Sequence, residues 1–232
     1  MITTIAFDAD DTLWHNERIF LDAKDKLKVL LGNYHDSAWI EKHLDATESH
    51  NIKHFGYGVK AFTLSMIETA CRLSEGRITG SEILEIIGVA RTMLATPIDL
   101  LDGVKDTILD LQGKYRIMLI TKGDLFDQET KLARSGLGDY FDIVEVVANK
   151  DKSTYEKLLL RHKINPKEFV MVGNSLKSDI LPVLEFGGKA VHIAYETEWF
   201  HESVTDEELH GKEFTTLNKI SDLCEWLKSK QV

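Results

Sequence analysis

The chain has little cysteine and little proline, and it lacks long apolar runs. Its 232 residues include 2 cysteines and 3 prolines. Two cysteines are too few for a disulfide framework, which fits a reducing compartment. No stretch approaches the roughly 18 to 20 apolar residues that cross a bilayer, and the first residues, MITTIAFD, lack the positive charge of a signal peptide. We therefore expect a cytoplasmic protein with no membrane partner.

Positive charge is also scarce. Lys and Arg total 28 against 38 Asp and Glu, which gives a net charge of -10. A protein that binds nucleic acid through its backbone needs a basic face, and this balance does not favour one. The 43% of hydrophobic residues is typical of a folded globule. The length fits one large domain or a domain with a sizeable insertion, and the oligomeric state is left open.

The apolar pattern changes twice along the chain. A short apolar run at residues 5–7 ends abruptly in acidic residues, as a buried strand does before a loop. Residues 17–95 have a helical period that predicts three or four amphipathic helices, and Thr79 with Glu82 forms a capping-box pattern before the last of them. After Pro97, helix-like segments alternate with four strand-like runs, at residues 116–120, 143–147, 169–172 and 190–193.

This alternation predicts an α/β fold. Parallel strands need crossover connections, so the pattern favours a Rossmann-like parallel sheet of about five strands with helices on both faces. The helical block interrupts the pattern directly after the first strand. We therefore interpret residues 15–97 as an inserted α-helical cap, and residues 1–14 and 98–232 as the core.

Polar residues follow four of the apolar runs at the points where the strands end. In chain order they are Asp8 and Asp10; Thr121 and Lys122; Asn149 and Lys150; Asn174 and Asp179. Ligands of open α/β sheets bind at the carboxyl ends of the strands, so we expect these side chains to converge there. Carboxylates, a hydroxyl and an ammonium group indicate a site for a divalent cation and a phosphate.

Each of these residues also has a structural interpretation. Alone, the acidic segment 8–12 could be a turn with a helix cap. An EF-hand loop is excluded, because Leu13 stands where Gly is needed and Ile19 where Glu is needed. Thr121 could close a strand or cap a helix, and Asp179 could interact with a helix dipole. The ordered set at successive strand ends favours the functional interpretation.

With these motifs the sequence resembles the haloacid dehalogenase-like superfamily of phosphohydrolases. The resemblance covers essentially the whole chain, including an α-helical cap in the position of that family's first cap class, C1. It rests on four motifs in order, namely Asp8-Ala9-Asp10-Asp11-Thr12, IMLIT ending in Thr121, Lys150, and GNSLKSD with Asn174 and Asp179. It implies an Mg²⁺-dependent phosphatase that hydrolyses a small phosphorylated metabolite.

The resemblance also implies roles for single residues. Asp8 would be the nucleophile that forms an aspartyl-phosphate, and Asp10 the general acid and base. Relatives that cleave carbon–halogen bonds are expected to lack an acid at the position of Asp10, so its presence argues for phosphate chemistry. Thr121 and the backbone N–H of Lys122 would bind the phosphate, and Lys150 would bridge Asp8 and the phosphate.

The implied magnesium site uses Asp8, the backbone carbonyl of Asp10, and Asp179, with Asn174 acting through a water. Asn174 departs from the commonest pattern, which has Asp there, and a neutral amide adds no charge. Lys152 is a rival of Lys150, because a capping-box pattern of Ser153 with Glu156 puts both lysines in the loop before a helix. We favour Lys150 because it lies nearer the strand end.

Specificity is expected to come from the cap. Gly56-Tyr57-Gly58 and Lys60, in a connection between cap helices, are candidates to face the leaving group, with a plain turn as the alternative. His50 and His54 have the spacing of a zinc pair, but a histidine pair without a metal is favoured, since no third ligand is evident. The acidic run 196–213 is interpreted as a solvated surface.

Two other classes of function stay open. A receiver-type signalling module also combines acidic residues, a Thr and a Lys on a parallel sheet, but its phosphorylated Asp comes from a later strand and it has no large cap. The second alternative is a binding protein whose site has degenerated, to which Asn174 alone points.

Overall fold

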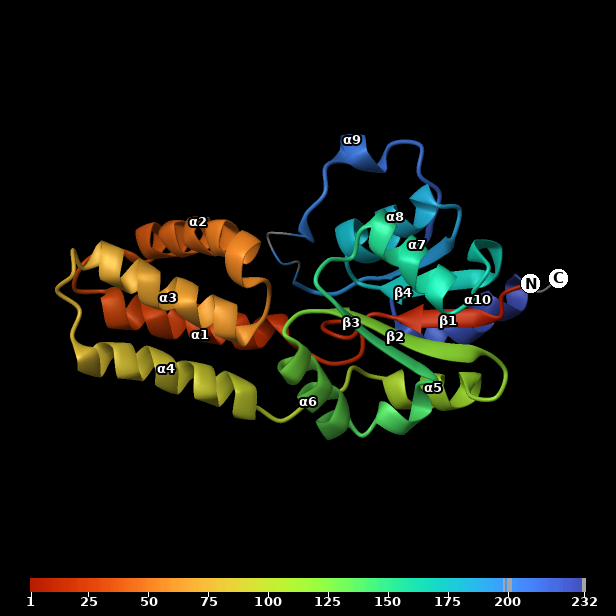
Figure 1. The fold of residues 1–232 in the computed structure, drawn as a ribbon, viewed down its shortest axis with the longest axis horizontal. Coiled ribbons are helices and arrows are strands. Elements are labelled where there is room, and N and C mark those ends of the chain that lie inside the picture. Colours follow the sequence, from red (N-terminus) through yellow and green to blue (C-terminus); the bar gives the residue numbers. More distant parts are fainter. Residues whose placement is uncertain (198, 200–201, 231–232) are drawn as a thin grey trace. The chain divides into compact units, whose positions relative to one another are not determined.

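The computed structural model describes residues 1–197, 199 and 202–230, and the chain divides into two compact units. One unit contains the sheet and comprises Met1–Glu17, Ile98–Lys122 and Gln128–Val232. The other is helical and comprises Arg18–Pro97 and Gly123–Asp127 (Figure 1). The role of residues 15–97 as a cap stays a prediction.

The sheet unit holds six parallel strands in the order β3-β2-β1-β4-β5-β6. The strands are β1 (Thr4–Phe7), β2 (Arg116–Lys122), β3 (Ile143–Val147), β4 (Phe169–Gly173), β5 (Lys189–Ile193) and β6 (Thr215–Leu217). The predicted α/β fold is confirmed. The sequence missed β6, because an edge strand of three partly exposed residues leaves no apolar run.

Helices cover both faces of this sheet, as Figure 1 shows. Ile5 and Phe7 of β1 point to one face and Ala6 points to the other, as the pleat of a strand dictates. The first face packs against α5 (Val104–Leu111), α6 (Leu125–Ser135) and α10 (Leu223–Ser229), and the second against α7 (Lys152–Arg161) and α8 (Leu181–Glu185). A further short helix, α9, spans Asp206–Leu209.

The central strand β1 lies where the order of the strands in the sheet reverses. The chain passes from β1 to β2 and β3 on one side, and then returns to β4 on the other side. Residues Thr4 to Phe7 pair with both β2 and β4, so β1 is buried between them. A switch point of this kind leaves a crevice at the carboxyl end of the central strand. Asp8 is the first residue beyond that end.

The helical unit is built from α1 (Glu17–Leu31), α2 (Ser37–Phe55), α3 (Val59–Leu73) and α4 (Gly80–Ala95). Their apolar faces form one core, in which Leu44, Phe62 and Met66 are almost fully buried. The capping box before α4 is confirmed, because the Glu82 N–H donates to Thr79 Oγ1 at 3.2 Å and the Thr79 N–H donates to Glu82 Oε2 at 2.7 Å.

Among the described residues, no helix combines the length and apolar character needed to span a membrane. Cys71 and Cys224 are both free cysteines and are partly buried.

Candidate active site

The loop after β1 is a tight turn that separates three acidic side chains. The Asp8 N–H donates to the Val172 carbonyl at 2.9 Å, so Asp8 still belongs to the sheet ladder. Asp11 adopts a left-handed conformation with φ of 60°. Its carboxylate accepts hydrogen bonds from the backbone N–H groups of Asn16 (2.8 Å) and Glu17 (3.0 Å), at the start of α1. Asp11 therefore caps a helix, whereas the carboxylates of Asp8 and Asp10 bond to side chains from other parts of the sheet unit.

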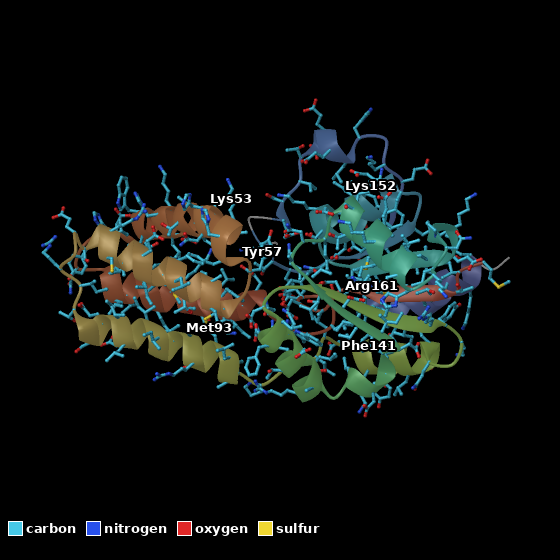
Figure 2. All side chains as sticks on the ribbon, in the orientation of Figure 1. Lys53, Tyr57, Met93, Phe141, Lys152 and Arg161 are labelled. Carbon is cyan, nitrogen blue, oxygen red and sulfur yellow. The ribbon has the colours of Figure 1, made fainter. Side chains whose placement is uncertain are left out.

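A buried lysine joins two of the predicted carboxylates. Lys150 Nζ forms an ion pair with Asp8 Oδ1 and a second, at 2.7 Å, with Asp179 Oδ1. All three residues are buried. Lys152, labelled in Figure 2, is instead the first residue of α7, and its Nζ lies 4.0 Å from Glu156 Oε1. Of the two lysines, only Lys150 is bonded to Asp8.

The predicted capping box of Ser153 with Glu156 is wrong. The N-cap of α7 is Asp151, whose carboxylate accepts a hydrogen bond from the Thr154 N–H at 2.8 Å. Asp151 is as good a cap as serine and adds a favourable interaction with the helix dipole, so the helix begins earlier. This start leaves Lys150 in the loop and places Lys152 on the helix surface.

Asp179 reaches Lys150 because Gly173 leaves room for it. Asp179 lies in a π-helical turn, Leu176–Ile180, before α8, and its Oδ2 accepts a hydrogen bond from the Ser175 N–H at 3.0 Å. A Cβ atom on Gly173 would lie 2.7 Å from the Asp179 Cβ and closer still to the carboxylate. Any other residue at position 173 would therefore displace Asp179.

Two carboxylates share one ammonium group at this point. Burial raises the pKa of Asp8 to about 7; Asp179 also raises it, and Lys150 opposes the rise. Burial lowers the pKa of Lys150, but the charges of Asp179 and Asp8 outweigh this and raise it above the ordinary value. The two carboxylates therefore favour the protonated form of Lys150. A further cation bound here would favour the ionised form of Asp8.

Polar atoms from two loops, those after β1 and β4, converge beside Asp8. Thr12 Oγ1 lies 3.1 Å from Asp8 Oδ2 and accepts a hydrogen bond from the Asn174 N–H at 3.0 Å. The Asn174 side-chain amide fits its neighbours best with its nitrogen 3.2 Å from the Asp10 carbonyl oxygen and 3.3 Å from Asp8 Oδ2. The Asp10 carbonyl and the Asp8 carboxylate are thus close enough to share one partner.

This donor set fits a hard divalent cation. Two carboxylates and a backbone carbonyl supply the oxygen ligands that Mg²⁺ prefers, and the excess negative charge favours a cation. Among the residues that the structure describes, no three His, Cys, Asp or Glu side chains form a metal-binding group. The predicted site does not need one, because Asp10 would contribute its backbone carbonyl.

The side chain of Asp10 is held by three donors that the sequence did not predict as its partners. Lys131 Nζ lies 2.8 Å from Asp10 Oδ1, Gln128 Nε2 donates to Oδ2 at 2.9 Å, and Trp14 Nε1 donates to Oδ1 at 2.7 Å. Burial raises the pKa of Asp10, but the Lys131 charge and these hydrogen bonds together hold it below its ordinary value. The structure therefore fixes the Asp10 carboxylate in position and favours its ionised form.

The end of β2 brings Thr121 and Lys122 to the same edge of the sheet. The buried Thr121 hydroxyl donates to Gln128 Oε1 at 3.0 Å, so Gln128 links Thr121 to Asp10. Lys122 Nζ donates to Ser178 Oγ at 3.1 Å and forms an ion pair with Glu202. The interpretation of the acidic run as a solvated surface is wrong for Glu202, whose side chain is only 12% exposed.

The candidates in the helical unit have simpler surroundings. Tyr57, labelled in Figure 2, lies in the short loop between α2 and α3. Lys60 lies in the first turn of α3 and not in the connection, and its Nζ is 2.9 Å from Asp124 Oδ1. His50 and His54 both lie on α2, and the centres of their rings are 5.2 Å apart.

Several residues of the site escaped the sequence analysis: Thr12 as a bridge to Asn174, Trp14, Gln128, Lys131 and Glu202. Gln128 and Lys131 could in part have been predicted from the sequence. They are three residues apart and so share one face of α6, the helix that follows the strand ending near Thr121. Glu202 could not, because it stands in a run of similar acids.

Comparison with known proteins gives a consistent set of matches. A model of the family described as haloacid dehalogenase-like hydrolase matches residues 2–187. A crystal structure of a haloacid dehalogenase-like family hydrolase from Xanthomonas campestris is 37% identical with a TM-score of 0.87, and the match covers 98% of this chain and 91% of that one.

Two curated relatives carry names of phosphate-releasing enzymes. N-acylneuraminate-9-phosphatase of Mus musculus is 28% identical over 109 residues, which make up 45% of this chain and 42% of that protein. The pyrimidine 5'-nucleotidase YjjG of Escherichia coli is 27% identical over 202 residues, covering 79% of this chain and 82% of the relative. The chain spans less than half the length of the first three curated relatives that it matches.

Proposed function

Because the chain belongs to the haloacid dehalogenase-like hydrolase family, we propose that it is an Mg²⁺-dependent phosphatase that hydrolyses a small phosphomonoester. One observation carries the proposal: the carboxylate of Asp8, at the end of the central strand, is held against Lys150 beside Asp179. That arrangement gives a nucleophile, a fixed cation for the phosphate and an acidic metal ligand. The relatives named as phosphatase and nucleotidase support the same reaction class.

The reaction would proceed in two transfers. In the first, an oxygen of Asp8 attacks phosphorus, the bond from phosphorus to the leaving oxygen breaks, and Asp10 donates a proton to that oxygen. In the second, Asp10 takes a proton from a water, the water oxygen attacks phosphorus, and the bond to Asp8 breaks to release inorganic phosphate. Thr121 and the Lys122 N–H would hold phosphate oxygens, and Lys150 would offset their charge.

Asp10 must change protonation state between these transfers. Lys131 favours the ionised form, which serves as the base in the second transfer. The first transfer needs the protonated form, and a dianionic substrate close to Asp10 would raise its pKa because like charges disfavour ionisation. The hydrogen bonds from Gln128 and Trp14 keep the carboxylate in place in both forms.

The charges of the site support a role for a bound metal ion. Four carboxylates (Asp8, Asp10, Asp179 and Glu202) face three ammonium groups (Lys122, Lys131 and Lys150), which leaves one excess negative charge when Asp8 is ionised. A phosphomonoester dianion adds two more. Magnesium bound to Asp8, the Asp10 carbonyl and Asp179, with Asn174 through a water, would offset this repulsion and polarise the phosphate.

The test is turnover of p-nitrophenyl phosphate. We expect activity that depends on added Mg²⁺ and that is abolished in Asp8→Asn. Asp110→Asn, which removes the same charge at an exposed position in the sheet unit, is the matched control and should retain full activity. Undiminished turnover in purified Asp8→Asn would refute the assignment of the nucleophile.

The two alternatives make different predictions. A receiver-type module would keep its phosphate for hours, whereas a phosphatase loses it within a catalytic cycle, and membership of a hydrolase family supports the latter. A degenerate binding protein would not bind Mg²⁺. Isothermal titration with Mg²⁺ separates this case, and we expect binding that is lost in Asp179→Asn.

A further inference from the structure

Among the described residues of the acidic run, Glu202 has a side chain that is largely shielded from solvent, with 12% exposed, and the reaction scheme has no use for it. Its carboxylate accepts hydrogen bonds from the hydroxyls of Ser175 and Ser178 and pairs with Lys122. Burial raises the pKa of Glu202, but the charge of Lys122 and these hydrogen bonds outweigh it and lower the pKa, so the group is ionised.

Glu202 lies beside the residues assigned to phosphate and metal. Ser175 follows Asn174 in the chain, Ser178 precedes Asp179, and the Lys122 N–H is the predicted phosphate donor. The Lys122 ammonium also donates to Ser178 Oγ at 3.1 Å and lies 5.7 Å from the centre of the Trp199 ring. The carboxylate thus binds the end of β2 to the turn after β4, and it cancels a positive charge that adjoins the substrate site.

We propose that Glu202 is a specificity-determining residue, which neutralises Lys122 and thereby makes the site select phosphomonoesters whose leaving group carries no negative charge of its own. The proposal rests on the proposed function. Each lysine assigned to the site is bonded to a carboxylate: Lys150 to Asp8 and Asp179, Lys131 to Asp10, and Lys122 to Glu202. A second anionic group on the substrate therefore meets a cation that is already neutralised, next to an added carboxylate.

Lys60, the cationic candidate in the helical unit, is similarly paired with Asp124. The substrate class that fits is a phosphate ester of a neutral alcohol, such as a polyol or a nucleoside. A phosphate ester of a hydroxy acid is disfavoured.

The experiment compares glycerol phosphate, whose leaving group is neutral, with phosphoglycolate, whose leaving group carries a carboxylate. The readout is the ratio of kcat/KM for phosphoglycolate to that for glycerol phosphate. We expect Glu202→Gln to raise this ratio by about tenfold, because it leaves Lys122 as an unneutralised cation close to the substrate. Lys122→Gln should lower the ratio, and the double variant should return it to within about twofold of the wild-type value.

The opposite changes of the ratio expected in Glu202→Gln and Lys122→Gln separate an effect of charge from an effect on the structure. A purely structural role of Glu202 would lower both activities and leave the ratio unchanged, and that result would overturn the inference. Glu213→Gln, which removes the same charge at an exposed position, is the control and should leave the ratio unchanged.

Binding in the Asp8→Asn background makes the test independent of turnover. We expect calorimetry in the presence of Mg²⁺ to show that adding Glu202→Gln strengthens phosphoglycolate binding about tenfold relative to glycerol phosphate. If both compounds bind but their relative affinity does not change, the inference about Glu202 fails and the proposed function stands. If neither binds at millimolar concentration, the site is not a phosphomonoester site and both fail.

Discussion

Both units bury charged and polar side chains, but the two units differ in where along the chain the hydrogen-bonded partners of these side chains lie. In the sheet unit, Lys150 bonds to Asp8 and Asp179, which are 142 and 29 residues away in the chain. In the helical unit, Asn51 bonds to Ser65 and Glu68 of the adjacent helix, at 3.2 and 2.8 Å. The first arrangement gathers charges at strand ends, and the second joins two neighbouring helices.

This difference in sequence separation indicates the role of each set of buried polar residues. Burying an ion pair gains little stability, because desolvation offsets the attraction. A cluster of buried charges drawn from distant segments is therefore better explained by chemistry than by folding. Polar contacts between adjacent helices need no such explanation. Variants in the buried charge cluster of the sheet unit should change catalysis, whereas variants in the helical unit away from its loops should change stability.

The largest effect is expected for Lys150→Met. It removes the cation shared by Asp8 and Asp179, so we expect kcat for p-nitrophenyl phosphate to fall by at least about 100-fold. Lys152→Met removes the same charge two residues away on the exposed start of α7 and should leave kcat unchanged. Equal losses in the two variants would show that the choice between these lysines is wrong.

A pair of glycine variants should have opposite effects in the two units. Gly173→Ala forces a Cβ against Asp179, so we expect Mg²⁺ affinity to fall at least about tenfold and the free energy of unfolding to drop by about 1–3 kcal/mol. Gly88→Ala lies within α4, where an added Cβ contacts nothing within 4 Å. It should raise the free energy of unfolding by about 0.5–1 kcal/mol. Calorimetry with Mg²⁺ and chemical denaturation measure the two quantities, and a tolerated Gly173→Ala would contradict the packing argument.

A third comparison uses one lysine from each unit. Lys131→Met removes the partner of Asp10, and we expect kcat to fall about tenfold because the acid–base group loses its fixed position. Lys24→Met removes the pair with Asp45 in the helical unit, at 2.8 Å. It should lower the free energy of unfolding by about 1–2 kcal/mol and leave kcat unchanged. If Lys24→Met also lowers kcat under conditions in which the variant is fully folded, the contrast between the two units is wrong.

The smallest effect is expected at the start of α4. Thr79→Ala removes the capping box with Glu82 and should lower the free energy of unfolding by about 1 kcal/mol. Activity per folded molecule should not change. A kinetic effect as large as that of Lys131→Met would show that the helical unit contributes to chemistry through its stability.

Much of the sheet could be predicted because β1, β2 and β4 are buried and therefore read as apolar runs. The residues that follow them could be predicted for the same reason, since Asp8 and Thr121 stand at the abrupt ends of such runs. β6 could not, because an edge strand needs no apolar run. The start of α7 was misplaced because Asp151 and Ser153 are both good caps, and only packing decides between them.

The partners of the candidate carboxylates were harder to predict than the carboxylates themselves. Lys131 and Gln128 contact Asp10 from a helix that begins after Thr121, and the sequence does not specify how that helix is rotated. Glu202 pairs with Lys122, 80 residues away in the chain, from a segment rich in acidic residues that gives no sign of which acid is shielded from solvent. Such contacts depend on tertiary packing, which leaves no local pattern.

The most direct test of the account is a crystal structure of the protein with Mg²⁺ and beryllium trifluoride, which mimics a phosphoryl group on a carboxylate. We expect beryllium to be bonded to a carboxylate oxygen of Asp8, with Thr121, the Lys122 N–H and Lys150 bound to the fluorines. A fluoride adduct on another side chain, or an Asp8 carboxylate that remains unmodified at saturating concentration, would contradict the central claim.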